Sequence, residues 1–469
     1  MSVDFQRDDY QEALPDWEMV DTLCDGESAV KRAGEKLLPN PVISTGETKG
    51  EIANIYARYL ERSLYVNIVG RTRASLIGAV FRKPPSYSAP ANLDYMQADC
   101  DGNGLSIYQQ SQKTLEDTLT AGRCGLLVDF PQTDGAVSLA DMQSGLIRAN
   151  ICHYDADEII NWQHKRVGGR SLLSKVVLAE KADVTEGFET KSVRQLRELS
   201  LDDGVYVVRL WRKNEKTKEW ERYADDTFPL QANGQPWNFI PFTFVGAINN
   251  DSGIDQAPLF DLACVNRKHY QLGADWYNAL YFAGQPQPVI SGLTEDWRDW
   301  LEKNGIVVGS RAPFLLPEGG TFNYATVTAD TAIQKELTDL VATMAMLGAR
   351  LVQPGEAVKT ATQSAGDQEV SHSVVSLAAE NVSDAYTQAL AWAQMFMGGS
   401  GACEYRLSND LSVIQWDAQI LAAIVDAWQS GTLPKSDAIR FMQRIGLADG
   451  TKSVEDIIEE LDGAGVNLG

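Results

Sequence analysis

The chain has 469 residues, a net charge of −23, and a composition of 44% hydrophobic and 22% charged residues. These values are typical of a folded protein with a large core and two to four structural regions. The sequence contains no run of about 18 apolar residues, the length that crosses a membrane, so we expect no membrane contact. Because an acidic chain repels phosphate, we do not expect it to grip a nucleic-acid backbone.

The N-terminal residues 1–30 contain nine Asp or Glu against one Arg. We expect this arm to be solvated and mobile, and it lacks the basic start and apolar core of a signal peptide. The six cysteines are scattered without a C-x-x-C pair, which favours free thiols in a reducing compartment. The acidity has two interpretations that composition does not separate: solubility, or a surface that DNA must pass without adhering.

The first regular elements are predicted to be helical. Apolar residues at helical spacing over 50–82 predict a helical opening that ends at Pro84-Pro85. A second helix is predicted over 105–121, where Ser106 and Gln109 have the spacing of a capping box.

From 124 to 250 the pattern changes to strands rich in Val, Leu and Phe. Residues 205–224 predict a hairpin with Asn214–Lys218 as its turn region. We expect the polar run 182–203 to be a surface insertion. The stretch CEYRLSND, beginning at Cys403, predicts one more short strand, and the last 55 residues have helical patterns.

Three long helices dominate the region from 255 to 401. They are predicted over 258–283, 330–352 and 364–397, with a short β-like insert after the first and Pro354-Gly355 after the second. Each carries an apolar stripe with polar residues on its other faces, and such a stripe must be covered. Identical neighbours in a ring would cover it, which points to an assembly component more than to an enzyme with a pocket.

Sequence motifs for catalysis are missing. The chain has no G-x-x-x-x-G-K-[ST] phosphate loop, no G-x-G-x-x-G after a strand and no H-E-x-x-H, and it has four histidines. We therefore expect no enzymatic activity, no cofactor and no metal.

The best local match to a cation site is Asp99 to Gly104, which fits the first half of a calcium loop. Its twelfth position is Gln110, where a bidentate Glu is needed, so a glycine-rich turn before Ser106 is the simpler interpretation. A second cluster, with His153, Asp155, Asp157 and Glu158, is compatible with metal binding or acid–base work, but a loop joining a strand to Ile159-Ile160 explains it and is preferred.

Aromatic residues on the first long helix offer another possible contact. Trp276, Tyr277 and Tyr281 could stack on bases, but they lack interleaved cations, so packing between helices is preferred.

Several phrases, taken together and in order, resemble the portal (head-to-tail connector) proteins of tailed bacteriophages, in a branch long catalogued as a domain of unknown function. They are YLERSLYVNIVGRTRASLIGAVFRKPP (59–85), AGRCGLLVDFP (121–131), YDADEIINWQ (154–163), PLFDLACVNRKHYQLGADWYNALYFAGQPQPVISG (258–292) and MAMLGARLVQ (344–353). None is catalytic, so the specificity of the resemblance lies in their number and order.

The resemblance implies a mostly helical α+β fold with portal architecture: an α/β wing, a two-helix stem, a small α/β clip, a long tunnel helix and a helical crown. On this chain it implies an acidic arm at 1–29, wing at 30–253, stem helix at 254–284, clip at 285–328, returning stem helix at 329–353, tunnel loop at 354–364, tunnel helix and return to the wing at 365–410, and crown at 411–469.

As a member of that family the chain would form a ring, usually of twelve subunits, at one capsid vertex of the virion, assembled in the host cytoplasm. The ring would pass double-stranded DNA during packaging and ejection. Its partners would be the terminase large subunit, major capsid and scaffolding proteins, and head-completion or adaptor proteins. The alternatives are a soluble metal-dependent enzyme and a helical scaffold or adaptor without a channel.

The resemblance also implies three sets of site residues. DNA in the tunnel would meet Lys359, the sole cation of its loop, with Thr360 and Thr362; an ordinary solvent loop outside any channel is the alternative. The stem helices would pack between subunits through Leu259, Leu262, Tyr270, Trp276, Leu340, Met344 and Leu347. The clip would use Trp297, Trp300 and Arg311.

Overall fold

The computed structural model divides the chain into two units, Met1–Asn409 and Asp410–Gly469. It describes residues 2–42, 49–131, 147–214, 216–285, 287–292, 294–304, 318–325, 331–352 and 373–408, together with the isolated residues 316, 436, 453, 454 and 458. The first unit combines helices and sheets, as the α+β expectation requires. The region expected to form a crown lies almost wholly outside the described residues.

The N-terminal segment is a docked helix, so the prediction of a solvated, mobile arm is wrong. Helix α1 (Asp8–Cys24) packs against α4, α5 and α7, and α2 (Glu27–Ala33) follows it. The side chains of Tyr10, Trp17 and Leu23 are buried. The count of acidic residues concealed these apolar positions, which recur at helical spacing between the charges.

The predicted helical opening is interrupted. It consists of α3 (Lys49–Arg62) and α4 (Ile68–Val80), separated by five residues. The break is held by Asn67, whose Oδ1 accepts the backbone N–H of Gly70 at 2.8 Å and caps α4. Capping by a short polar side chain favours a new helix start over a continuous helix.

A small antiparallel sheet forms the centre of the first unit. Its strands are β2 (Arg123–Asp129), β3 (Asn150–Tyr154) and β9 (Phe242–Gly246), in the order β3-β2-β9. Helix α5 (Ile107–Ala121) packs on it and begins with the predicted capping box, in which Ser106 and Gln109 satisfy one another's backbone N–H groups. Helix α10 (Val374–Met397) packs beside α5.

A second sheet is a five-stranded meander in the order β4-β5-β6-β7-β8. After the short η3 turn (Ala156–Glu158) the strands are β4 (Ile159–Val167), β5 (Arg170–Glu186), β6 (Glu189–Asp202), β7 (Val205–Lys213) and β8 (Trp220–Arg222). The hairpin predicted over 205–224 is confirmed.

The polar run 182–203, by contrast, is not an insertion. It forms the end of β5 and all of β6, where Leu196 and Leu199 are buried. Polar residues dominate the exposed part of this long hairpin and hid the strand pattern.

Two short strands close the first unit over a long sequence distance. Strand β1 (Ser86–Ser88) pairs antiparallel with β12 (Glu404–Arg406), which is the strand predicted in CEYRLSND, and η2 (Ala91–Gln97) follows β1. Tyr87 is the register partner of Tyr405.

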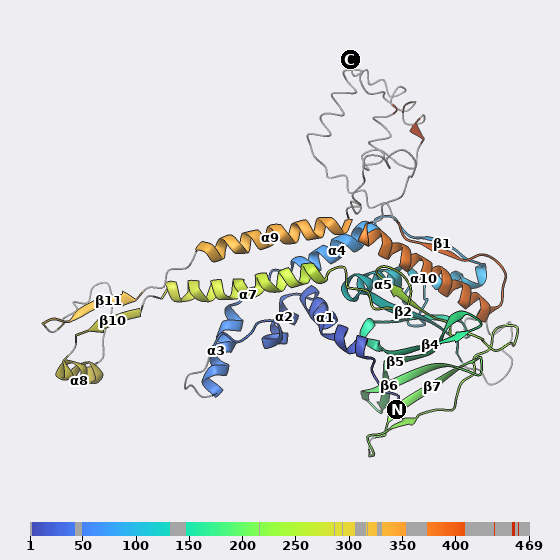
Figure 1. The fold of residues 1–469 in the computed structure, drawn as a ribbon, viewed down its shortest axis with the longest axis horizontal. Helices are drawn as coiled ribbons and strands as arrows, with labels where there is room; N and C mark the ends of the chain where they lie inside the picture. The colour runs from blue at the N-terminus through green and yellow to red at the C-terminus, as the bar shows by residue number, and fades with distance from the viewer. Residues whose placement is uncertain are drawn as a thin grey trace. The chain divides into compact units, whose positions relative to one another are not determined.

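The long helices α7 (Phe260–Ala283) and α9 (Thr331–Val352) lie side by side and run in opposite directions (Figure 1). Between them in the chain come β10 (Gln287–Ser291), α8 (Glu295–Asn304) and β11 (Thr321–Ala325), and the two strands pair antiparallel. The third long helix is described from Val374 onward. The predicted tunnel loop lies outside the described residues, and no described helix is long and apolar enough to cross a membrane.

The docking of α1 gives a direct test. Replacing Trp17, which is 6% exposed, with Ala should lower the free energy of unfolding by about 3–5 kcal/mol, because a large cavity opens between α1 and its neighbours. Replacing the adjacent exposed Glu18 with Ala should change it by less than about 0.5 kcal/mol. Urea unfolding followed by fluorescence and circular dichroism measures both. Equal midpoints for the two variants would show that α1 does not dock.

Candidate assembly surface and acidic cluster

The helix pair α7–α9 covers part of its own apolar surface. Leu259, Leu262, Tyr270 and Met344 are at most 1% exposed within the single chain. These four side chains are therefore already covered within one chain, and packing of the predicted set between subunits stays a prediction. Trp276, Leu340 and Leu347 are half-buried.

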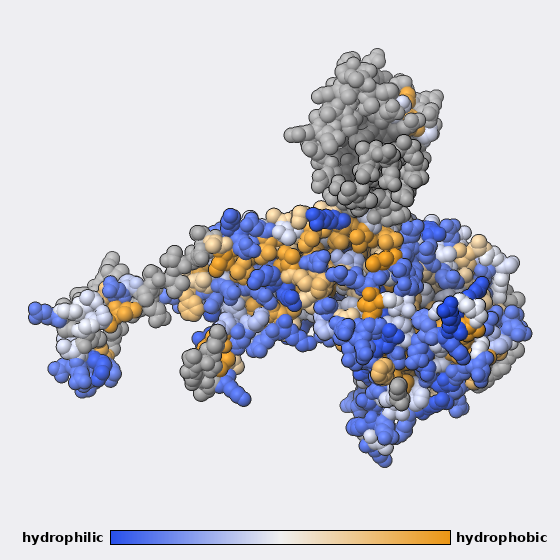
Figure 2. All heavy atoms as spheres, viewed as in Figure 1, coloured by the Kyte–Doolittle hydropathy of each residue, from blue (hydrophilic) through white to orange (hydrophobic). Residues whose placement is uncertain are grey.

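What remains uncovered on the pair is a set of large apolar side chains at its outer faces. We call it the assembly surface: Tyr277, Leu280, Tyr281 and Phe282 on α7, which are 38–48% exposed, with Val341 and Met346 on α9, which are 43% and 49% exposed. Figure 2 shows hydrophobic residues gathered along this helix pair. Scattered exposed apolar residues are ordinary, whereas contiguous patches mark surfaces that bind other proteins, so these six side chains are candidates for such a contact.

Helix α3 fixes the position of α7 through polar contacts. The hydroxyl of Tyr59 donates to Asp275 Oδ1 at 2.6 Å, and Arg62 donates to Asn278 Oδ1 at 2.9 Å. The guanidinium of Arg62 also lies 4.2 Å from the ring centroid of Tyr281. These contacts hold the exposed end of α7 against α3 and so pre-organise the assembly surface.

The predicted clip residues lie on α8, between the two long helices in the chain. The rings of Trp297 and Trp300 have centroids 5.5 Å apart, and Trp300 is 53% exposed. Val289 on β10 and Tyr324 on β11 are also exposed. The third predicted clip residue, Arg311, and the tunnel-loop residues Lys359, Thr360 and Thr362 lie outside the described residues.

The loop at 99–104 has the contacts of a turn. Asp99 Oδ1 accepts the backbone N–H groups of Gly102 and Gly104, and its other oxygen pairs with Arg148. Gln110, at the position where a calcium ligand is needed, is buried and donates to the carbonyl of Ile151 at 2.7 Å. Because the carboxylate is occupied and the twelfth side chain lies in the core, the turn interpretation is the better supported one.

The cluster around His153 gains a member that the sequence did not indicate. Asp117 comes from α5, and its Oδ2 lies 2.7 Å from His153 Nε2, while Asp155 Oδ1 lies 3.1 Å from the same nitrogen. Lys113 pairs with Asp155 at 2.8 Å. Asp117 is 36 residues from His153 in sequence, and nothing in its helical pattern singles it out.

These groups form a closed ion network. Burial alone would lower the pKa of His153, but hydrogen bonds to Asp117 and Asp155 raise it above its ordinary value, which favours the imidazolium form. His153 and Lys113 face Asp117 and Asp155, and the side chains of Asp117, His153 and Asp155 lie close enough to hold a metal ion.

The hydroxyl group beside His153 is not accessible to a substrate. The hydroxyl of Thr114 lies 3.1 Å from His153 Nδ1, which resembles a nucleophile–base pair. However, Thr114 is fully buried and its hydroxyl donates to the carbonyl of Gln110. A substrate cannot reach it, so the arrangement links α5 to β3 structurally.

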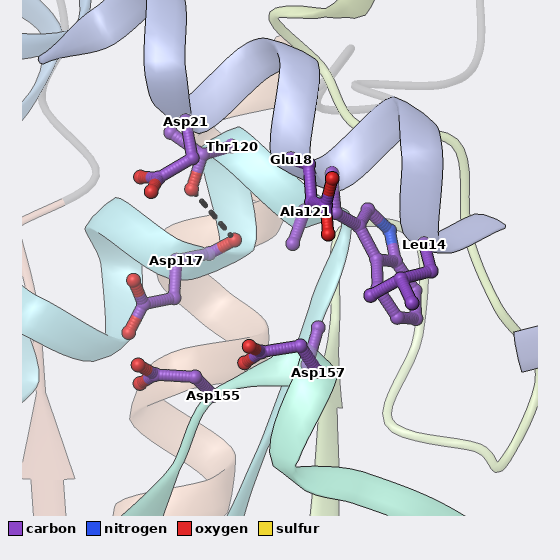
Figure 3. A pocket seen from close by; sticks show the side chains of 10 residues that line it. Leu14, Glu18, Asp21, Asp117, Thr120, Ala121, Asp155 and Asp157 are labelled. Atoms are coloured by element: carbon purple, nitrogen blue, oxygen red, sulfur yellow. Dashed lines mark hydrogen bonds between the residues drawn. The ribbon is translucent and has the colours of Figure 1, made fainter. Parts of the chain in front are cut away.

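A cavity of about 170 Å³ lies next to the network, between α1, α5 and the η3 turn. Figure 3 shows its carboxylates, from Glu18, Asp21, Asp117, Asp155 and Asp157, converging on one space. Acidic side chains crowded in this way raise one another's pKa. Burial, with repulsion from Asp155 and Asp157, raises the pKa of Glu158 at the end of the η3 turn to about 7.

This shift makes stability depend on pH. Because the folded protein disfavours ionised Glu158, stability falls as pH rises through about 7, and a neutral amide should escape the loss. Glu158→Gln keeps an acceptor for the N–H of Asp155, which now donates to Glu158 at 3.0 Å. We expect the variant to melt about 1–3 °C above the parent at pH 8 and the gap to shrink at pH 5.

The matched control is Glu12→Gln, which changes an exposed glutamate of α1. It should melt like the parent at both pH values. A pH-independent gap for Glu158→Gln would show that ionisation is not its cause. Thermal shift measurements on all three proteins decide.

Comparison with known proteins gives one family match. Residues 258–397, from the start of α7 to the end of α10, match a domain of unknown function, DUF4055. The match agrees with the branch of the portal family that the sequence resembles. It covers less than a third of the chain. No curated protein matches.

Three of the solved structures with similarity are remote. They include the neck of an empty gene transfer agent particle computed with C6 symmetry (14% identity, 80% of this chain and 90% of that chain, TM-score 0.39) and the virion of a native gene transfer agent particle (14% identity, 89% and 98%, TM-score 0.38). The neck of the native particle, computed with C12 symmetry, aligns at 14% identity over 80% and 89%, with a TM-score of 0.37. At these scores the alignments carry no argument.

Proposed function

We propose that this chain is a portal protein. It forms a ring at one capsid vertex, passes viral DNA during packaging and ejection, and serves as a docking platform for the terminase motor and the head-completion or tail proteins. The observation that carries the proposal is the antiparallel α7–α9 pair, whose outer faces leave six large apolar side chains uncovered. The resemblance of the sequence to portal proteins implies a stem helix, a clip and a returning stem helix in this order, and the α7–α9 pair agrees with that order.

Covering these exposed apolar side chains favours assembly into a symmetric oligomer. Apolar side chains at half exposure gain free energy when a partner covers them, at about 25 cal/mol per Å². Copies of one chain provide such a partner repeatedly, and a head-to-tail contact that closes makes a ring. The β10–β11 pair and α8, at the joined end of the two helices, then stand where the family has its clip.

The charge is consistent with a conduit. Tight DNA binding requires many Lys and Arg contacts to phosphate, each of which releases counterions. A chain with a net charge of −23 repels the duplex and lets it move. In this proposal the partners are double-stranded DNA in transit, the terminase large subunit, major capsid and scaffolding proteins, and head-completion proteins; assembly takes place in the host cytoplasm, and the protein ends in the virion.

The first test measures assembly mass. A ring of twelve 51.5 kDa chains has a mass of about 620 kDa, whereas a protein of ordinary assembly ranges from monomer to tetramer. Leu280→Asp and Val341→Asp, at positions 40% and 43% exposed in the single chain, should fold normally and fail to assemble, because each buries an unpaired charge at a contact. Light scattering and negative-stain images measure the outcome.

These positions are better suited to the test than Leu340 or Leu347, which are half-buried in the subunit, so that a charge there also disturbs folding. The control is Ile248→Asp, at a position 60% exposed and off the helix pair, which should still assemble. A stable monomer of the parent protein at micromolar concentration contradicts the ring.

The second test concerns the loop that lies outside the described residues. The resemblance assigns Lys359 to the narrowest part of the channel, where a circle of lysines would make weak, salt-dependent contacts with phosphate. Lys359→Glu should leave the ring intact and reduce DNA packaged or retained in an in vitro assay. Lys216→Glu, in the exposed β7–β8 turn, is the control. If Lys359→Glu and Lys216→Glu package and retain equal amounts of DNA, Lys359 has no such role.

The alternatives have less support. A metal-dependent enzyme would use the His153 cluster, in which His153 already bonds to Asp117, Lys113 already pairs with Asp155, and the neighbouring hydroxyl is buried. A helical scaffold without a channel shares the assembly surface, and negative-stain images separate it from a portal by the central hole.

A further inference from the structure

The five-stranded meander carries opposite charges at its two ends. Residues 159–179 contain four Lys or Arg and no Asp or Glu, in a chain whose net charge is −23. Three of these cations, Lys165, Arg166 and Arg170, surround the β4–β5 turn and are exposed. At the same turn Val167 is 49% exposed. We call residues 164–172 the basic tip.

The next turn of the meander has the reverse composition. Residues 182–190 contain three acidic residues and no Lys or Arg. Asp183 and Glu189 are exposed, and Phe188, in the two-residue turn between β5 and β6, is completely exposed. We call residues 182–190 the acidic tip.

The topology places these tips at opposite ends of one sheet. Successive turns of an antiparallel meander lie at opposite ends of its strands. Strand β5, which joins the two tips, has 17 residues. At about 3.3 Å per residue the tips are therefore roughly 55 Å apart. Positive φ angles at Gly168, Gly169 and Gly187 allow both turns to be two residues long, which fixes the flanking side chains.

Five exposed charged residues at the two turns take part in no ion pair within the described part of the chain. The ion pairs of this sheet join other residues, such as Lys175 to Glu198 and Arg197 to Glu180. Lys165, Arg166 and Arg170 take part in none of those described, and neither do Asp183 and Glu189.

We propose that in the assembled ring the basic tip of one copy binds the acidic tip of the next. This inference rests on the proposed function, which supplies a head-to-tail arrangement of identical copies. Each subunit then offers two different surfaces to its two neighbours, as a closed ring of this kind requires. The two tips are complementary in sign and equal in number of charges, and each has one exposed apolar side chain.

A second copy fits these tips better than DNA does. Three cations are too few for stable, sequence-independent binding to a duplex, which depends on many phosphate contacts. Duplex DNA would use neither the exposed Val167 nor the acidic tip. Because exposed ion pairs contribute little to affinity, the contact needs the packing of Val167 against Phe188, while the charges select the partner and its register.

Cross-linking tests the contact directly. The double variant Val167→Cys/Phe188→Cys, assembled and mildly oxidised, should give a ladder of covalent multimers on a non-reducing gel. Each single variant should give none, and all three proteins keep the six native cysteines as a common background. An intact ring without a ladder overturns the proposal, as does a dimer formed by one single variant, which would indicate contact between like tips.

Charge exchange tests its chemistry. Arg166→Glu/Arg170→Glu should reduce the assembled fraction about threefold or more at moderate salt, and Asp183→Lys/Glu189→Lys should do the same, because like charges then meet. Combining all four changes should restore assembly. Circular dichroism and melting of the subunits check that these surface variants fold.

The outcomes separate this inference from the proposed function. A parent protein that never forms a ring refutes the function, and the inference falls with it. A parent ring that none of the charge variants weakens refutes the inference alone. Loss of duplex binding by Arg166→Glu/Arg170→Glu, with assembly unchanged, would assign the basic tip to nucleic acid and likewise overturn it.

Discussion

One buried amide, that of Asn266 on α7, determines how the helices of the first unit are joined. Its Oδ1 accepts the backbone N–H groups of Ile68 and Val69 at 3.1 and 3.0 Å, at the start of α4, and its Nδ2 donates to the carbonyl of Val66. Tyr65, beside it, donates to the carbonyl of Leu23 at the end of α1. Helix starts leave N–H groups without partners, and a fully buried amide that satisfies them fixes α7 against α4 and α1.

The function proposed here depends on that fixed orientation. With α7 anchored at its first half, its second half passes the C-terminal end of α3, where Tyr59 and Arg62 hold it by hydrogen bonds to Asp275 and Asn278. Helix α9 then packs on α7 and leaves the assembly surface uncovered. The same body carries the meander, so the helix pair and the charged tips are presented to neighbours by one framework.

Much of this fold could be predicted from the local pattern of apolar and turn residues. The elements that were predicted wrongly share a cause. The long helices, the capping box at Ser106 and the β7–β8 hairpin follow from periodicity and turn residues close in sequence. The docking of α1 and the strands within 182–203 did not, because charged and polar residues on their exposed faces outweigh the buried ones in any count. Asp117 joins His153 only through tertiary packing. Which faces of α7 and α9 cover one another, and so which side chains remain free, is likewise invisible to a helical period.

The pairing of β1 with β12 has a consequence for how the protein is made. Strand β1 cannot pair with β12 until β12 has been synthesised. Tyr405, the register partner of Tyr87, follows it by more than 300 residues. At about 5–20 residues per second this delay is roughly 15–60 s. Helices α7 and α9 are synthesised within that interval, so their apolar faces emerge before the first unit can close. A nascent chain in this state needs chaperone protection or early pairing with another copy, and the order of synthesis thus becomes a constraint on assembly.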